Sequence, residues 1–167
     1  MPDHVAIVGY MGSGKTTVGR LLANRTNRDF VDLDHEISRA AGRTIPEIFA
    51  EGGEERFRDL EHAALVSALD HPDPAVISCG GGAVTRPENR AALLQTPTVF
   101  LSEDVDALFE RTRGDDRPLR CGSREDFSRR YAERLPLYRE VADVEVHADG
   151  RGAADVAEEV ARWLQTR

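Results

Sequence analysis

Short apolar runs alternate along the chain with segments of helical periodicity. Five of these runs predict strands, at residues 4–9, 29–33, 75–79, 98–101 and 144–147. The first, third and fourth are almost continuously apolar, which is typical of parallel strands covered on both faces. Strands that alternate with helices indicate a parallel sheet flanked by helices. We therefore expect a three-layer α/β fold with a five-stranded parallel sheet at its centre.

Apolar residues spaced three or four apart predict the helices between these strands. The predicted helices span residues 16–25, 54–69, a short segment from Arg86, a segment through Phe109 capped by Asp104 or Ser102, and residues 153–164. Two stretches, at residues 43–53 and 114–123, interrupt the alternation of strands and helices. Their apolar residues do not follow the spacing of a strand or a helix. We expect both to be excursions above the sheet, of the kind that forms mobile lids.

Composition restricts the protein to a few classes. With 167 residues we expect one domain, spanning residues 1–167, because this length suffices for one well-buried core. The net charge of −8 argues against nucleic acid as the main partner, since phosphate backbones bind basic surfaces. No apolar run approaches the ~20 residues that cross a bilayer, and the first residues lack a signal-peptide pattern. Cys79 and Cys121 lie far apart without metal-binding spacing, which favours reduced thiols and a cytoplasmic protein.

Residues 9–17 carry the clearest chemical motif, Gly-Tyr-Met-Gly-Ser-Gly-Lys-Thr-Thr, between the first predicted strand and helix. This context and spacing are those of a phosphate-binding loop, whose backbone N–H groups surround nucleotide phosphates. Lys15 is expected to reach the β- and γ-phosphates, and Thr16 to hold Mg²⁺. Lys15 is also the only lysine in the chain, and a compact ammonium suits a phosphate. The alternative is a glycine-rich turn without a ligand.

Two carboxylates follow the second predicted strand. Asp32 and Asp34 occupy alternate positions, so both side chains are expected on one side at the carboxyl end of that strand. Ligands of open parallel sheets bind at this edge. One carboxylate could order Mg²⁺ or its waters while the other accepts a proton from a substrate hydroxyl. Alternatively, Asp34 caps a helix that starts near His35.

A glycine run and several arginines complete the candidate site. Residues 80–82 are all glycine and follow the third predicted strand, where their backbone N–H groups could meet an anion or a hydroxyl. Arg58 has Glu61 three residues later, near enough on a helix to orient its guanidinium. Arg117 precedes a proline in the lid-like stretch and could stabilise the transferring phosphoryl group. Arg134 is a further candidate, although each arginine alone could be a solvated surface charge.

Taken together, these motifs resemble the shikimate kinases, which are small P-loop kinases of the nucleoside-monophosphate-kinase type. The resemblance covers nearly the whole chain and rests on residues 9–20, 32–34, 42–49, 53–61, 80–84, 117–119 and 134–138. It implies a P-loop kinase fold and transfer of the γ-phosphoryl group of ATP to the 3-hydroxyl of shikimate. The products would be shikimate 3-phosphate and ADP, in the biosynthesis of chorismate and the aromatic amino acids.

The resemblance also implies residue roles. Asp34 would be the base, Lys15 and Arg117 would complete the catalytic set, and Thr16 with Asp32 would serve Mg²⁺. The implied ATP-binding residues are Gly12, Ser13, Gly14, Lys15, Thr16, Thr17, Arg111, Arg117 and Arg151. The implied substrate-binding residues are Asp34, Arg58, Gly80, Gly81, Gly82 and Arg134.

The arginines take distinct places in this comparison. Arg111 would pack on adenine, with Arg151 a weaker candidate near the base. Arg58 and Arg134 would bind the substrate carboxylate. The substrate-binding segment would span residues 33–61 and the lid residues 112–124, in a chain expected to act as a monomer without nucleic acid or membrane partners. Where relatives often continue with an apolar residue, Arg120 follows the lid motif.

Two alternatives remain open. A kinase for another small polyol acid, such as gluconate, would keep the phosphate loop and lack the combination of Asp34, Arg58, three glycines and Arg134. A nucleotide switch or non-catalytic binding module would show no acceptor dependence. A guanine-nucleotide switch usually carries an Asn-Lys-x-Asp motif, and the chain has no second lysine to supply it.

Overall fold

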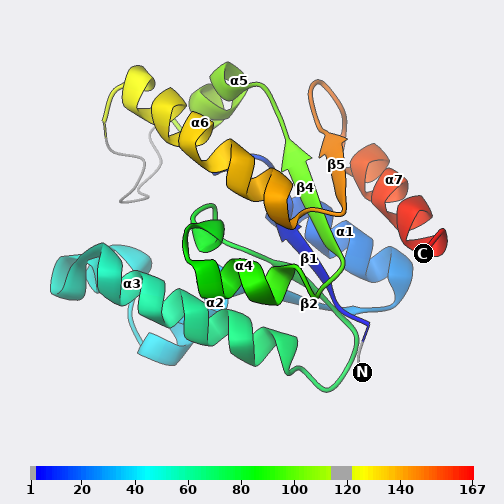
Figure 1. The fold of residues 1–167 in the computed structure, drawn as a ribbon, viewed down its shortest axis with the longest axis horizontal. Coiled ribbons are helices and arrows are strands. Elements are labelled where there is room, and N and C mark those ends of the chain that lie inside the picture. Colours follow the sequence, from blue (N-terminus) through cyan, green and yellow to red (C-terminus); the bar gives the residue numbers. More distant parts are fainter. Residues whose placement is uncertain (1–2, 114–121) are drawn as a thin grey trace.

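The sheet at the centre of the molecule has five parallel strands in the order β2-β3-β1-β4-β5 (Figure 1). The structure is a computed structural model, in which residues 3–113 and 122–167 are described. The strands are β1 (Val5–Val8), β2 (Asp29–Asp32), β3 (Ala75–Ser78), β4 (Thr98–Ser102) and β5 (Val144–His147). The predicted α/β fold with a five-stranded parallel sheet is confirmed.

Helices connect successive strands and end the chain. In the described residues they are α1 (Lys15–Thr26), α2 (Leu33–Ala41), α3 (Ile45–Leu69), α4 (Pro87–Leu93), α5 (Val105–Arg111), α6 (Arg124–Val141) and α7 (Ala153–Gln165), with a short 3₁₀ helix η1 (Ala83–Thr85).

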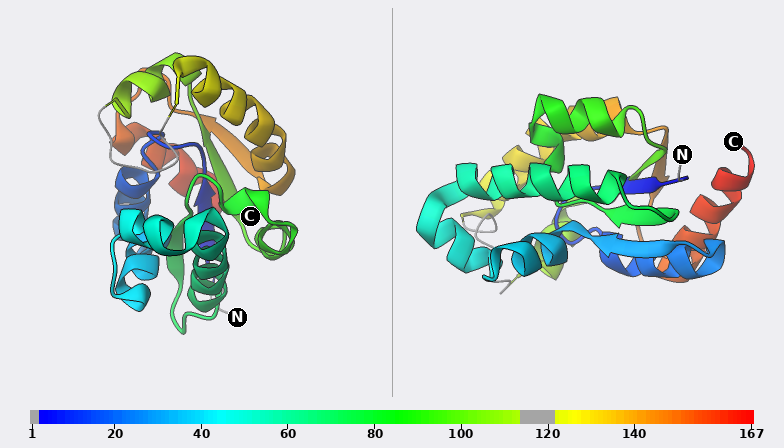
Figure 2. Two further views of the ribbon diagram at one scale, coloured as in Figure 1. Left: turned by 90° about the vertical axis from the view of Figure 1, so that its left-hand side faces the viewer. Right: turned by 90° about the horizontal axis from the view of Figure 1, so that it is seen from below.

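The helices form one layer on each face of the sheet (Figure 2). In β1, Val5 and Ile7 belong to a core shared with α1 and α7, whereas Ala6 and Val8 belong to a core shared with α3, α4 and α6. All four side chains are fully buried. Because successive strand residues point to opposite faces, an apolar run such as β1 requires cover on both sides.

The carboxyl ends of the strands meet at one edge of the sheet. The phosphate loop follows β1, Asp32 ends β2, and Gly80 comes shortly after β3. Ser78 at the end of β3 lies in register between Ile7 of β1 and Asp32 of β2. The fold thus brings the sequence motifs to the edge where parallel sheets bind ligands.

The end of β2 differs from the prediction. The strand stops at Asp32 and α2 begins at Leu33, so Asp34 lies in the first turn of the helix and not on the strand. The Asp32 side chain accepts a hydrogen bond from the backbone N–H of His35 at 3.3 Å. Asp32 is therefore the helix cap, and the alternative interpretation of Asp34 as that cap is wrong.

The first expected excursion is mostly helical. Thr44 and Glu47 form a reciprocal capping box that starts α3 at Ile45, a geometry that satisfies two free N–H groups of the first turn. A kink at Gly53, with φ 68° and ψ −169°, divides α3 into two parts. The second part contains the predicted helix at residues 54–69.

Helix α6 was not predicted from the sequence. It starts with a capping box between Ser123 and Asp126 and contains Pro136 in its interior. Since α6 carries Arg134, the missed helix also determines where that arginine lies.

Two further observations bear on the compositional predictions. Among the described residues, no helix is both long and apolar enough to cross a membrane. Cys79 is a free, buried cysteine, and burial raises the pKa of its thiol to about 12. A thiol with so high a pKa stays protonated at neutral pH and is a poor nucleophile. Cys121 lies outside the described residues.

Candidate active site

The phosphate loop has the backbone conformation that its glycines allow. Gly12 and Gly14 have φ values of 84° and 85°, in the left-handed region that favours glycine. At Gly9, a Cβ atom would lie 2.8 Å from the carbonyl oxygen of Leu101. Helix α1 begins at Lys15, directly after Gly14. Its first N–H groups and its positive dipole end therefore face the loop, where an anion can bind.

The Lys15 side chain turns back over this loop. Its Nζ atom donates to the carbonyl oxygen of Tyr10 at 3.0 Å and lies 3.5 Å from Ser13 Oγ. The ammonium is thus held against the loop, and Lys15 lines a cavity there. Thr17, the other predicted residue of the loop end, lines the same cavity.

Thr16 and Asp32 meet at the start of α1. The Thr16 hydroxyl donates to Asp32 Oδ2 at 2.8 Å, so a hydroxyl and a carboxylate stand side by side next to the phosphate loop. Mg²⁺ is commonly bound by one or two such side chains together with substrate phosphates and waters. Among the described residues, no group of three or more His, Cys, Asp or Glu side chains could hold a metal ion. A hydroxyl and a carboxylate of this kind fit a Mg²⁺ ion that takes its other ligands from phosphates and waters.

A cavity of about 330 Å³ lies between the phosphate loop and the ends of β2 and β3. It is lined by Gly12, Gly14, Lys15, Thr16, Thr17, Asp32, Asp34, Ser78, Cys79, Gly80, Gly81, Arg111 and Thr112. Most of the residues predicted to bind phosphate and metal are therefore brought together with Asp34 in one space.

A buried ion pair lies beside the glycine run. Arg58 Nη1 donates to Glu61 Oε1 at 2.7 Å and Nη2 lies 3.4 Å from Glu54 Oε1. A Cβ atom at Gly80 would lie 2.6 Å from Glu61 Oε2, and one at Gly82 would lie 2.1 Å from Arg58 Nη2. Both glycines are thus required for the backbone to approach the ion pair so closely.

Glu61 keeps one oxygen without a partner. Its side chain is fully buried, and among the described residues no group forms a hydrogen bond with Oε2. Burial raises the pKa of the Glu61 carboxyl above its usual range, while the charge of Arg58 opposes that shift. An unpaired buried acceptor is costly, so this oxygen is suited to a donor that enters with a ligand.

Arg134 lies on α6 with only 6% of its surface exposed. Its Cζ atom is 5.8 Å from the centre of the Tyr10 ring, and its charge acts on Glu61. Within the described part of the chain, the buried Nη1 atom has no hydrogen-bond partner. A buried guanidinium donor without an acceptor indicates a site for an anion, and a carboxylate is the group that it pairs with best.

The family of the chain is established by comparison with known proteins. A family profile for shikimate kinase matches residues 11–165. The chain belongs to the shikimate kinase family. It is 44% identical to a shikimate kinase of Symbiobacterium thermophilum, over 98% of this chain and 97% of the relative. Among solved structures, a shikimate kinase of Acinetobacter baumannii in complex with shikimate superposes with a TM-score of 0.91, at 38% identity, over 99% of this chain and 94% of the other.

One of the alternative activities has only a distant likeness. A gluconokinase of Sinorhizobium meliloti superposes with a TM-score of 0.60 at 19% identity, over 99% of this chain and 93% of that structure. This likeness shows the shared fold alone. The shikimate kinase family membership therefore separates this chain from the kinase for another polyol acid.

Three arginines of the predicted ATP site have different surroundings. Arg111 lines the cavity, where Nη1 donates to the carbonyl oxygen of Gly12 at 3.0 Å and the guanidinium pairs with Glu103. Arg151 follows β5, donates to the carbonyl oxygen of His147 at 3.0 Å, and lies outside this cavity. Arg117 and most of the predicted lid lie outside the described residues.

Glu103 and Tyr138 were not singled out from the sequence as site residues. Glu103 directly follows β4 and reaches Arg111, a pairing of residues eight apart that no helical spacing rule suggests. The Tyr138 hydroxyl donates to the carbonyl oxygen of Gly81, and burial raises the pKa of Tyr138. Only the position of Tyr138 one turn after Arg134 could have indicated that it supports the glycine run.

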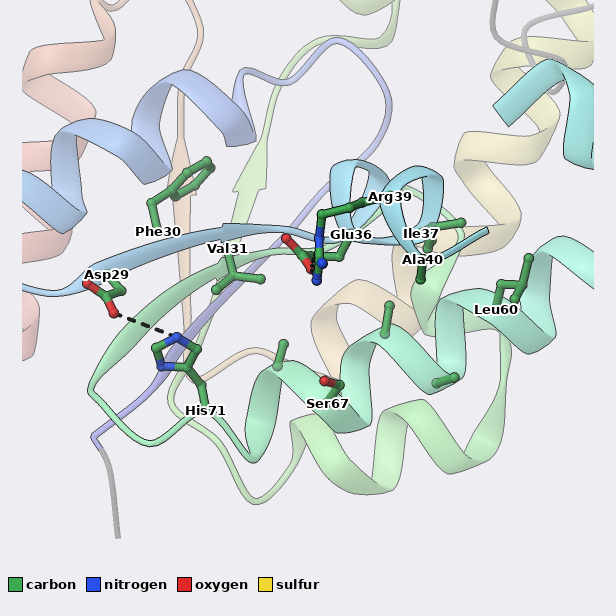
Figure 3. A pocket seen from close by; sticks show the side chains of 13 residues that line it. Asp29, Phe30, Val31, Glu36, Ile37, Arg39, Ala40, Leu60, Ser67 and His71 are labelled. Carbon is green, nitrogen blue, oxygen red and sulfur yellow. Dashed lines mark hydrogen bonds and ion pairs between the residues drawn. The ribbon is translucent and has the colours of Figure 1, made fainter. Parts of the chain in front are cut away.

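A second cavity, of about 560 Å³, lies between the edge strand β2, α2 and α3 (Figure 3). It includes His71, whose Nε2 lies 3.6 Å from Asp29 Oδ2, but no residue of the phosphate loop. Although it is larger than the cavity at the sheet edge, it lacks the groups that shikimate kinase chemistry requires. The smaller cavity at the sheet edge is therefore the candidate active site.

Proposed function

We propose that this chain transfers the γ-phosphoryl group of ATP to the 3-hydroxyl of shikimate, giving shikimate 3-phosphate and ADP. The observation that carries this proposal is the buried Nη1 of Arg134, which has no hydrogen-bond partner among the described residues, on a guanidinium whose charge acts on Glu61 of the Arg58–Glu61 pair. Shikimate has a carboxylate and ring hydroxyls. Its carboxylate would supply the acceptor that Arg134 lacks, and Arg58 would share that contact. A neutral polyol would leave the buried donor unsatisfied.

The nucleotide would bind on the side of the phosphate loop. Backbone N–H groups from Gly12 to Thr17 and the start of α1 would receive the phosphates, and Lys15 would exchange its contact with Tyr10 for the β- and γ-phosphates. Arg111 and Arg151 would contact the nucleoside. Thr16 and Asp32 would hold Mg²⁺, which when bound neutralises charge on the phosphate oxygens.

The acceptor hydroxyl would be activated by Asp34. Asp34 lines the cavity, and its Oδ1 lies 3.4 Å from where a Cβ of Gly80 would be. In the transfer, the 3-hydroxyl oxygen forms a bond to the γ-phosphorus while the bond to the β-phosphate oxygen breaks. The hydroxyl proton passes to the Asp34 carboxylate, and ADP leaves.

Two further assignments follow the sequence-based expectations. Arg117 would stabilise charge on the transferring group from the lid. The enzyme would act as a monomer in the cytoplasm, as expected from the sequence.

Formation of ADP, measured with and without shikimate, tests the activity. We expect turnover only when shikimate, ATP and Mg²⁺ are all present, and little turnover with gluconate as acceptor. ADP formation independent of any acceptor would indicate a nucleotide hydrolase or a switch, and faster turnover with gluconate would assign the chain to a different acceptor.

A further inference from the structure

Glu103 is a buried carboxylate that pairs with Arg111, a residue lining the cavity at the phosphate loop. Its side chain is only 1% exposed, and its two oxygens pair with Nη1 and Nη2 of Arg111, the last residue of α5. Two parallel hydrogen bonds between a guanidinium and a carboxylate fix the plane of the guanidinium as well as its position. The Arg111 side chain is therefore held in one place although it is 49% exposed.

The same guanidinium reaches the phosphate loop. Arg111 Nη1 donates to the carbonyl oxygen of Gly12 at 3.0 Å. The N–H of the following residue, Ser13, donates to the carbonyl oxygen of Tyr10 at 3.2 Å. The peptide group between Gly12 and Ser13 is thus fixed at both ends, by Arg111 on one side and within the loop on the other.

The loop also packs tightly against the end of α5. A Cβ atom at Gly12 would lie 3.0 Å from Thr112 Cγ2 and 3.2 Å from the carbonyl oxygen of Leu108. Gly12 has the positive φ of 84°, and because glycine adopts positive and negative φ values about equally readily, contacts from outside the loop can select this one. The contacts made by α5 favour this conformation.

We propose that Glu103 is a positioning residue of the nucleotide site, which holds Arg111 so that Arg111 fixes Gly12 and the phosphate loop in the conformation that receives a triphosphate. Without the carboxylate, the Arg111 side chain is free to leave Gly12, and the loop must become ordered when the triphosphate binds. The free-energy cost of ordering the loop then lowers the affinity for the triphosphate. The inference rests on the proposed function insofar as it takes ATP as the physiological ligand.

The test compares Glu103→Gln with Glu110→Gln. Glutamine keeps the shape of Glu103 but offers one acceptor oxygen and no charge. Glu110 lies on the same helix and pairs with Arg113 at 3.6 Å, with both side chains more than half exposed, and Glu110→Gln therefore serves as the matched control. Binding of a non-hydrolysable ATP analogue and of tripolyphosphate, each with Mg²⁺, is measured by calorimetry alongside KM for ATP and for shikimate.

We expect Glu103→Gln to weaken both phosphate ligands about tenfold, the loss of roughly one charge-assisted contact. KM for ATP should rise by a similar factor, while KM for shikimate and the properties of Glu110→Gln stay within about twofold of the wild type. Arg111→Lys, which keeps the charge but cannot contact Glu103 and Gly12 together, should reproduce the loss of tripolyphosphate binding.

Other outcomes would overturn the inference. If ATP-analogue binding weakens while tripolyphosphate binding is unchanged, Glu103 acts on the nucleoside and not on the loop. If neither changes, the pair only stabilises α5. A thermal melt of each variant without ligand identifies misfolding. If Glu103→Gln does not fold, tripolyphosphate binding by Arg111→Lys tests the inference in its place. Absence of shikimate-dependent ADP formation in the wild type would instead contradict the proposed function and leave the tripolyphosphate comparison valid.

Discussion

The unpaired donor of Arg134 gives the sharpest prediction for a single residue. If its Nη1 meets the shikimate carboxylate, a charge-assisted bond of about 1.5–3 kcal/mol is at stake. An acceptor with an amide in place of the acid, or Arg134→Ala with shikimate itself, should lose about 10- to 100-fold in kcat/KM. Arg134→Lys should also be poor, because lysine keeps the charge and lacks the planar fork.

The contact itself is tested by combining Arg134→Ala with the amide analogue in a double-mutant cycle. Coupling between the two changes would place the guanidinium and the carboxylate in contact. Additive losses would mean that they do not meet, and the carboxylate assignment would then have to pass to Arg58.

Gly82 is predicted to be intolerant of even a methyl group. Its φ of −104° and ψ of 7° are open to alanine, but the added Cβ would lie 2.1 Å from Arg58 Nη2. Arg58 must therefore move, and we expect Gly82→Ala to raise KM for shikimate about tenfold, with a smaller change in KM for ATP.

The matched control is Gly152→Ala, at the start of α7. Gly152 has a φ of −72°, and the nearest atom to its added Cβ is 3.9 Å away. Steady-state kinetics should be unchanged in this variant. Wild-type shikimate kinetics in Gly82→Ala would show that the position of Arg58 is not decisive for the acceptor.

At the scale of elements, the kink in α3 separates residues 45–52 from the part of the helix that carries Arg58 and Glu61. Gly53 has φ 68° and ψ −169°, a region essentially restricted to glycine. Gly53→Ala should therefore lower the free energy of unfolding by about 1–3 kcal/mol, measured by urea denaturation against the wild type. Unchanged stability would mean that the helix can straighten without cost.

The elements also show what the sequence could and could not predict. Phe127, Tyr131, Leu135 and Tyr138 have the spacing of a helix face, and α6 forms although Pro136 in its interior removes a hydrogen bond and clashes with the preceding turn. The contacts of this face with the sheet and α5 outweigh that local cost. Local propensity therefore failed where tertiary packing decided the structure.

For the candidate site, the motifs could be predicted from the sequence because each depends on the spacing of residues close together in the chain. The phosphate loop needs only its glycines, its lysine and the flanking strand and helix. The Glu103–Arg111 pair could not be predicted from the sequence, since it depends on how α5 lies against the phosphate loop. Asp34 was predicted at the end of a strand, because the sequence does not show that Asp32 ends the strand and also caps a helix that begins at the next residue.

At the scale of the whole molecule, the strand order could not be read from the alternation of strands and helices. It depends on pairings such as Val5 with Val76 and Ala6 with Thr98, between residues far apart in the chain. The position of the site was predictable all the same, since every order of parallel strands places the carboxyl ends at one edge.

Ligand binding should stabilise the whole fold. A nucleotide at about 100 times its Kd contributes roughly 2.7 kcal/mol, which for a chain of this size is about 5–10 °C in Tm. We expect ATP with Mg²⁺ to produce such a shift in a thermal melt, and a chelator to reduce it by removing the metal that we propose Asp32 and Thr16 hold with the phosphates. A shift unaffected by the chelator would contradict the metal assignment.

The position of Lys15 has a consequence for the chemistry of labelling. Lys15 is the sole lysine in the sequence, and its Nζ lies at the cavity, 3.0 Å from the Tyr10 carbonyl. A reagent that acylates amines therefore finds one side-chain target, and a mass spectrum of the peptide that contains Lys15 reports its modification. Bound ATP should shield that amine, so the fraction labelled at each nucleotide concentration measures occupancy of the site directly, without turnover.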